Sequence, residues 1–179
     1  MSQPGHAMTA LAFTSPAIRF MVMHHFTRAC SSPMDLTPAL GMSTSFRKTV
    51  GESDVYMFAG ITGDLAPNHV DEQFMRGTQY GRRIAHGALM VGYMSTTSTM
   101  VNDLMAKRMP EIFPVSLGYD KVRFLKPVFI GDTITVRYEV ESIDAAKNRT
   151  MAKVEVSNED GDVVAAAVHL MTWLPRKTD

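Results

Sequence analysis

The sequence predicts a single α+β domain in which one long central helix is wrapped by an antiparallel β-sheet. Residues 85–102 contain no charged side chain, and the Ser/Thr run at 95–99 is too polar for a membrane span, so a buried core helix is expected. The second half of the chain changes to alternation with period two, which is typical of β-strands. A long apolar helix ahead of several strands buries its surface only if the sheet packs around it.

One strand and two short helices are predicted before the long helix. Residues 44–50 are a strand candidate, and Ser53 is the expected N-cap of the helix that follows. Gly60 and Gly63 mark the end of this helix, and residues 70–75 are predicted to form a second, shorter one. The apolar stripe of the first helix has helical spacing and comprises Val55, Phe58 and Ile61.

Four strands are predicted after the long helix. In the first, Val115, Leu117 and Tyr119 are expected to share one face, and the broken phase that follows indicates a bulge near Asp120. The turn at 159–162 contains an Asp-Gly pair suited to positive φ. The other three strands are predicted at residues 134–141, 151–157 and 163–174. The last of these is apolar on both faces, so it is expected inside the sheet.

Composition excludes several classes of protein. The 179 residues include 18 basic and 18 acidic side chains, which cancel, so bulk charge does not indicate a nucleic-acid partner. Cys30 is the only cysteine, which excludes an intrachain disulfide and a multi-thiolate zinc site. A reducing compartment, the cytoplasm, is the simplest interpretation.

The first 34 residues differ from the rest because they contain no Asp or Glu and carry Arg19 and Arg28. This composition fits a transit peptide, which would direct the protein to mitochondria. It fits equally well an upstream start codon that adds an unstructured extension. The predicted boundaries are an N-terminal extension at residues 1–40 and one domain at residues 41–179, with both interpretations of the extension left open.

Asp64 and His69 are the candidate acid–base pair. Pro67 lies between them, lacks a backbone N–H and disfavours helix before it, so the two residues cannot sit one turn apart on a regular helix. A turning segment allows a carboxylate and an imidazole to converge on one small volume, where they can activate water or move a proton. Taken alone, the two residues also fit a turn aspartate and a histidine at the start of a helix.

The stretch 61–89 resembles the signature of the MaoC-like hydratase family, the (R)-specific enoyl-CoA hydratases of the hot-dog fold superfamily. The matching positions are Gly63, Asp64, Pro67, His69, Asp71, Ile84, His86, Gly87 and Leu89. Ala66 departs from the pattern, since the family usually has asparagine there. Residues 123–136 resemble later strands of the family, and the resemblance covers residues 45–174. It implies a hot-dog domain that acts as a homodimer on acyl-CoA substrates without a cofactor.

The resemblance also implies an activity, namely hydration of trans-2-enoyl-CoA thioesters to (R)-3-hydroxyacyl-CoA or the reverse dehydration. His69 would take a proton from the water that attacks the β-carbon, while Asp64 would hold this water and deliver a proton to the α-carbon. Gly87 would offer a backbone N–H to the thioester oxygen, unless it serves only close packing of helix on strand. For His86, a capping or packing role is favoured over proton transfer. Ser95 matches a serine that supports the pair in the family, although helix hydroxyls often bond their own backbone.

Five basic residues are candidate ligands for the phosphates of coenzyme A: Arg82, Arg83, Lys121, Arg123 and Lys126. A metal site is not expected, because His69 and Asp71 lack a third ligand at a suitable spacing. Two rival functions remain open. An acyl-CoA thioesterase would share the fold and the ligand, and a non-catalytic hot-dog subunit would be consistent with the departure at Ala66.

Overall fold

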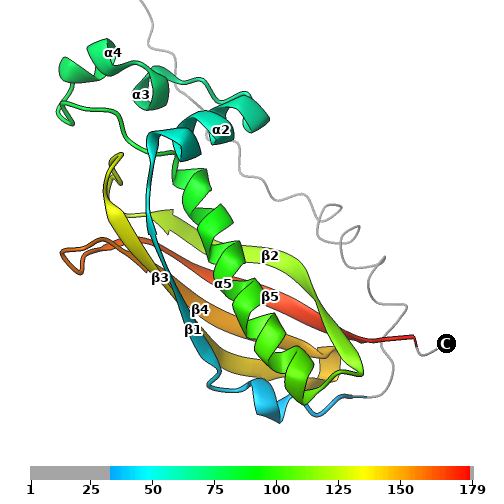
Figure 1. Cartoon of the computed structure of the whole chain (residues 1–179). Coiled ribbons are helices and arrows are strands. Elements are labelled where there is room, and N and C mark those ends of the chain that lie inside the picture. The colour runs from blue at the N-terminus through cyan, green and yellow to red at the C-terminus, as the bar shows by residue number, and fades with distance from the viewer. Residues whose placement is uncertain (1–32, 178–179) are drawn as a thin grey trace, which may run out of the picture. The chain divides into compact units, whose positions relative to one another are not determined.

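Five antiparallel strands form one sheet, and a long helix packs along one of its faces (Figure 1). The computed structural model describes residues 33–177, which belong to one compact unit. The strands are β1 (Ser43–Thr49), β2 (Ile112–Phe124), β3 (Thr133–Asp144), β4 (Arg149–Ser157) and β5 (Val163–Pro175). Their order is β1-β3-β4-β5-β2, so β1 and β2 form the two edges and β5 lies inside the sheet as predicted.

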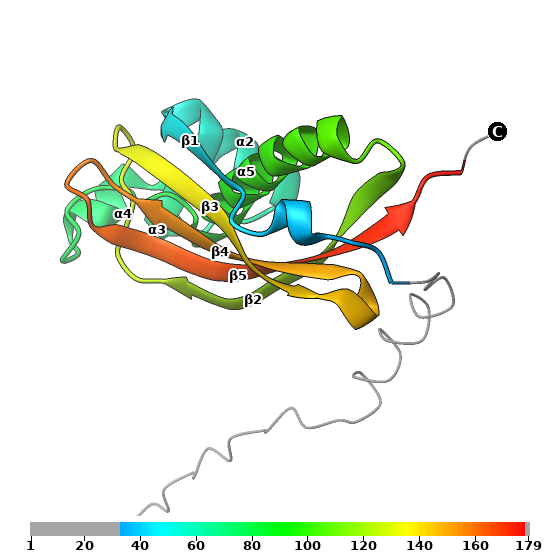
Figure 2. The ribbon, with the colours of Figure 1, turned by 90° about the horizontal axis from the view of Figure 1, so that it is seen from below.

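The long helix, α5 (Gly87–Arg108), forms the centre of the core. Its buried face includes Met90, Met94 and Met105, which pack with the inward residues of β3. The predicted alternation on β3 is confirmed, because its inward side chains Ile134, Val136, Tyr138 and Val140 are all at most 2% exposed. Figure 2 shows α5 on one side of the sheet from a second direction. The expected α+β arrangement of one helix against an antiparallel sheet is therefore confirmed.

Three short helices, α2 (Glu52–Thr62), α3 (Pro67–Val70) and α4 (Glu72–Arg76), gather at the N-terminal end of α5 (Figure 1). The prediction that Ser53 caps α2 is wrong. Gly51 is the N-cap, and the Asp54 carboxylate accepts the Gly51 N–H at 2.7 Å, which starts the helix two residues earlier. The predicted stripe is also only partly correct, because Val55 is buried but Ile61 is 85% exposed.

The edge strand β2 is irregular at two places. The register shifts between Asp120 and Arg123, which confirms the predicted bulge. A second shift, between Ser116 and Gly118, was not predicted. Because of this shift, Val115 pairs with Thr172 while Tyr119 pairs with His169, which places Val115 and Tyr119 on opposite faces; their predicted common face is wrong.

Residues ahead of the predicted domain start at residue 41 also pack against the core. Thr37–Ala39 forms a short 3₁₀ helix (η2), and Leu36 and Ala39 are at most 1% exposed in the core. The Met34 N–H also donates to the Asn148 side chain at 2.8 Å. A second 3₁₀ helix, η3 (Ala145–Lys147), joins β3 to β4.

The rest of the predicted N-terminal extension, residues 1–32, lies outside the described residues. Among the residues that are described, no helix is long and apolar enough to cross a membrane.

Candidate active site

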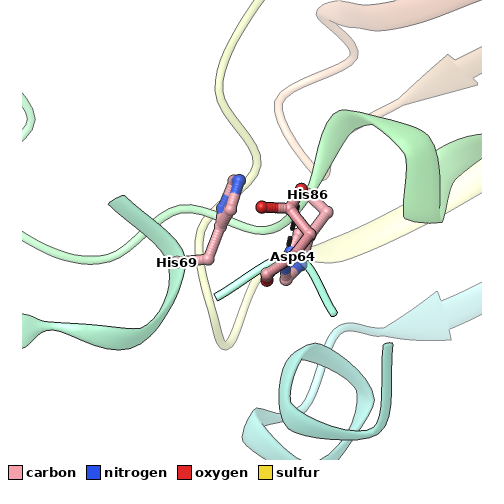
Figure 3. Close-up of side chains that lie close together, drawn as sticks. All are labelled: Asp64, His69 and His86. Atoms are coloured by element: carbon pink, nitrogen blue, oxygen red, sulfur yellow. Dashed lines mark hydrogen bonds and ion pairs between the residues drawn. The ribbon is translucent and has the colours of Figure 1, made fainter. Parts of the chain in front are cut away.

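The loop between α2 and α3 brings Asp64 and His69 together. Gly63 ends α2 in the left-handed conformation, with φ of 79°, and its N–H donates to the Ala59 carbonyl. Pro67 then occupies the first position of α3, where its missing N–H costs nothing, and His69 follows on this short helix. The chain therefore turns between the two residues, as predicted, and both side chains reach one volume (Figure 3).

Hydrogen bonds fix the proton position on His69. Its Nδ1 lies 2.8 Å from the Ile84 carbonyl oxygen, which can only accept, so Nδ1 carries the proton. The lone pair is then on Nε2, where the Asn68 amide nitrogen donates at 3.1 Å. A buried imidazole that lines a cavity and carries its lone pair on Nε2 is suited to accept a proton, once water replaces the Asn68 amide.

His86 lies against His69 in the same cluster. The two rings are stacked with centroids 3.8 Å apart and 28° between their planes, and Phe58 covers His86 at 4.8 Å. Nε2 of His86 lies 2.9 Å from the Asp64 backbone carbonyl and 4.0 Å from the Asp64 carboxylate. The side chain is 1% exposed, and its Nδ1 is buried without a hydrogen-bond partner in the described structure. Sequence spacing did not reveal this contact, since His86 is 17 residues after His69.

The Asp64 side chain is half-exposed, at 50%, in contrast to the two buried histidines. A carboxylate oxygen of Asp64 and one ring nitrogen from each histidine all lie within 4.8 Å of one another. One water molecule that makes two hydrogen bonds of about 2.8 Å at a tetrahedral angle spans about 4.6 Å. The cluster therefore has the dimensions to hold one water between an acid and a base.

The same three residues are also a possible metal-ligand set, with one carboxylate and two imidazoles. A nitrogen lone pair lies in the plane of its ring, and the planes of His69 and His86 are nearly parallel. Their lone pairs therefore lie in two separate, nearly parallel planes, which disfavours binding of both nitrogens to one ion. The geometry fits a proton-transfer cluster better than a metal centre.

A cavity of about 350 Å³ opens beside the histidines. Its lining includes both imidazoles, Asn68, Gly87 and Lys126, and its apolar walls are Met90, Phe124, Val128 and Val164. Asp64 is not among the lining residues. The cavity thus combines apolar walls with polar and basic side chains, as a small-molecule site does.

Gly87 is the first residue of α5 and lines this cavity. The first N–H groups of a helix have no partner within the helix and lie at its positive end, so they can donate to an oxygen that gains negative charge. A β-carbon on Gly87 would come within 2.6–2.8 Å of the Phe124 ring. Glycine is therefore also required by close packing, so both roles considered from the sequence are consistent with the structure.

Ser95 does not line the cavity. It is an exposed residue on α5, near the hydroxyl of Tyr119 on β2. Burial raises the pKa of Tyr119, and the neighbouring hydroxyls of Ser98 and Ser95 act in the opposite direction.

Of the five basic candidates, Lys126 lines the cavity and forms an exposed ion pair with Asp162. Arg83 is engaged elsewhere: its guanidinium pairs with Glu52 and Glu72, and these carboxylates raise its pKa. Arg82 lies over the Phe129 ring, beside Asp132. Lys121 and Arg123 are exposed on β2. The contacts favour Lys126 over Arg83 as a ligand for an anionic group.

The fold and the cluster together define the class of protein, a hot-dog domain with histidine and aspartate side chains gathered at the N-terminus of its central helix. The family model described as "MaoC like domain" matches residues 35–162. The chain therefore belongs to the MaoC-like domain family, which confirms the resemblance seen in its sequence.

Two named relatives and one solved structure are similar to this chain. An (R)-specific enoyl-CoA hydratase from Rhodospirillum rubrum is 36% identical over 103 residues, which is 58% of this chain and 66% of that protein, just under two thirds of its length. A 3-hydroxybutyryl-CoA dehydratase from Methylorubrum extorquens is 31% identical over 78% of this chain and 83% of its own length. The solved structure of the (R)-hydratase from A. caviae superposes with a TM-score of 0.63 at 26% identity, covering 76% of this chain and 96% of that chain.

Proposed function

We propose that this protein is a hydro-lyase that adds water to trans-2-enoyl-CoA thioesters to give (R)-3-hydroxyacyl-CoA, or catalyses the reverse dehydration. The observation that carries the proposal is the cluster of Asp64, His69 and His86 beside a cavity with both polar and apolar walls. One carboxylate oxygen and one ring nitrogen from each histidine lie within 4.8 Å of one another. The names of the hydratase and dehydratase relatives support the same activity.

In the proposed reaction, one water supplies the hydroxyl for the β-carbon and the double bond takes up one proton at the α-carbon. Nε2 of His69 accepts the proton of the attacking water, because Nδ1 is already protonated toward the Ile84 carbonyl. His69 passes this proton to the Asp64 carboxylate across the short gap between them, and Asp64 delivers it to the α-carbon. Both groups then end the reaction in the state in which they began it. General acid–base catalysis of this kind contributes about 10²–10⁴-fold.

Charge develops on the thioester oxygen as the β-carbon is attacked. The N–H at Gly87, at the start of α5, is the proposed donor to this oxygen. Lys126 is the proposed contact for a coenzyme A phosphate, since it lines the cavity, with Arg82, Lys121 and Arg123 as further candidates. His86 and Ser95 complete the proposed site residues. The contacts of His86 with His69 and with the Asp64 carbonyl support its inclusion more than any contact supports that of Ser95.

We propose that the protein acts as a homodimer in the cytoplasm, or in mitochondria if the N-terminal residues are a transit peptide. Among the described strands, the 13-residue edge strand β2 pairs with β5 alone, which favours pairing of its other edge with a second copy. No cofactor is proposed, because addition of water involves no electron transfer and requires only an acid and a base.

Crotonyl-CoA separates the proposed function from its two rivals. A hydratase lowers the enoyl absorbance without releasing thiol, a thioesterase releases free coenzyme A, and a non-catalytic subunit does neither. Loss of enoyl absorbance without thiol release is the expected result. Release of thiol without prior hydration would contradict the proposal and support the thioesterase.

A further inference from the structure

The loop that carries Asp64 has few long-range restraints. Leu65 and Ile61 are 64% and 85% exposed, so the loop is not anchored by buried apolar side chains on either side of Asp64. The methyl group of Ala66 offers no hydrogen bond. The other bonds of residues 63–66 are short-range, for example Leu65 N–H to the Gly63 carbonyl at 3.0 Å and Asp64 N–H to the Thr62 hydroxyl at 3.2 Å.

His86 provides the long-range restraint. Its Nε2 donates to the Asp64 carbonyl at 2.9 Å, a contact between residues 22 positions apart. Among the interactions of the described residues, this imidazole is the group that ties the Asp64 loop to the start of α5. Because a carbonyl oxygen only accepts, the bond also fixes His86 in the tautomer with its proton on Nε2.

The same ring sets the position of His69. One face of His86 stacks on His69 at 3.8 Å, and Phe58 packs against it at 4.8 Å. His86 is itself immobilised, since it is 1% exposed and the neighbouring Ala85 N–H bonds the Val128 carbonyl at 2.7 Å. A side chain held in this way contacts the acid by its edge and the base by its face.

We infer that His86 is a positioning residue, which sets the distance between Asp64 and His69 through one hydrogen bond and one ring stack. The inference rests on the proposed function, because it assigns His86 a role in the same acid–base pair. His86 neither gives nor takes a proton in the reaction. The rate of acid–base catalysis falls steeply when the acid and the base are displaced, and a misplacement of about 1 Å can lower the rate about 10²-fold.

Two substitutions separate the hydrogen bond from the stack. His86→Phe keeps an aromatic ring between Phe58 and His69 but removes the donor, whereas His86→Gln keeps an N–H donor and removes the ring. Thr49→Val is the matched control, since it removes one side-chain hydrogen bond, to Thr133, in strand β1 away from the cavity lining. The readouts are kcat and KM with crotonyl-CoA, hydrogen exchange of the amides of residues 63–66, and the melting temperature.

For His86→Phe we expect kcat to fall at least about tenfold with KM within about twofold, together with faster amide exchange in the loop. His86→Gln is expected to recover most of the slow exchange and part of kcat, and Thr49→Val to behave as the wild type. Wild-type kcat and loop exchange in His86→Phe would overturn the inference. So would equal losses in both variants with unchanged loop exchange, because these indicate packing alone. If His86→Phe does not fold, His86→Leu takes its place.

A double-variant cycle completes the test. In a background of Asp64→Asn with His69→Ala, adding His86→Phe is expected to cost no further rate, because the residue acts through the missing pair. A further loss of the same size as in the wild type would show an independent contribution to catalysis and would contradict the positioning role. If the wild-type protein fails to hydrate crotonyl-CoA, the proposed function fails, whereas the amide exchange of the loop still decides whether His86 positions Asp64.

Discussion

His169 should make the protein lose stability as the pH falls from neutral toward 4. The side chain is fully buried on β5, with Nε2 2.8 Å from the Ser116 hydroxyl and Nδ1 2.8 Å from the Tyr138 hydroxyl. Tyr119 stacks on the ring at 4.3 Å. Burial lowers the pKa of His169 from 6.5 to about 4, since the charged form would be removed from water without a carboxylate partner among these contacts.

The size of the effect follows from the two pKa values. Above pH 6.5 the histidine is neutral in both the folded and the unfolded chain, so it adds no pH dependence. Below pH 6.5 the unfolded chain binds a proton that the folded protein does not bind until about pH 4. At about 1.36 kcal/mol per pH unit, this interval lowers the free energy of unfolding by about 3 kcal/mol.

Urea unfolding at pH 7 and pH 4.5 measures the effect, with His169→Gln as the comparison. Glutamine does not titrate and can still bond the two hydroxyls, so the variant should lose less stability between the two pH values than the wild type. Carboxylates whose pKa values are lowered, such as Asp54, titrate in both proteins and cancel in the difference. Equal losses in wild type and variant would refute the assignment of the pH dependence to His169.

Further predictions concern the site and its surroundings. Asp64→Asn and His69→Ala should each lower kcat at least about 10²-fold with an unchanged circular dichroism spectrum, and near-normal turnover in either would contradict the mechanism. Arg83→Met should lower the free energy of unfolding by about 2 kcal/mol, because charged hydrogen bonds are lost, while KM for crotonyl-CoA stays the same. Lys126→Met should raise KM several-fold at an unchanged melting temperature, and the reverse pattern for these two variants would show that Arg83 is the coenzyme A contact.

Much of the fold was predictable because periodicity reports burial directly. The uncharged helix at 85–102 and the alternation at 134–141 both correspond to buried faces of the core. The predictions were wrong where a neighbouring side chain or a bulge had more influence on the local structure than the sequence pattern. Ser53 has a good N-cap side chain, but Asp54 bonds the Gly51 N–H and starts the helix earlier. The face of Val115 was misassigned because a bulge at Leu117 leaves no clear signal in the hydrophobic pattern.

The candidate site was predictable in its parts but not in its arrangement. The Gly63-Asp64 and Pro67 to His69 spacing indicated a turn that joins acid and base, and the structure has such a turn. The stack of His86 on His69 depends on how the start of α5 packs against α3, which no sequence spacing encodes. Likewise, Arg83 forms ion pairs with Glu52 and Glu72, which lie 31 and 11 positions away in the sequence. Sequence spacing does not predict these pairs.

The stereochemistry of hydration tests the central claim most directly. Asp64 in the loop before α3 and His69 on α3 reach one small volume, so both are expected to approach the alkene from the same face. Hydration of crotonyl-CoA in deuterated water, followed by chiral analysis and NMR of the 3-hydroxy product, reports the hand at the β-carbon and the relative placement of hydroxyl and deuteron. The expected product is the (R) isomer formed by syn addition. Anti addition would require a third group on the opposite face, and an (S) product would require the substrate to lie reversed over the pair; either result would contradict the proposed mechanism.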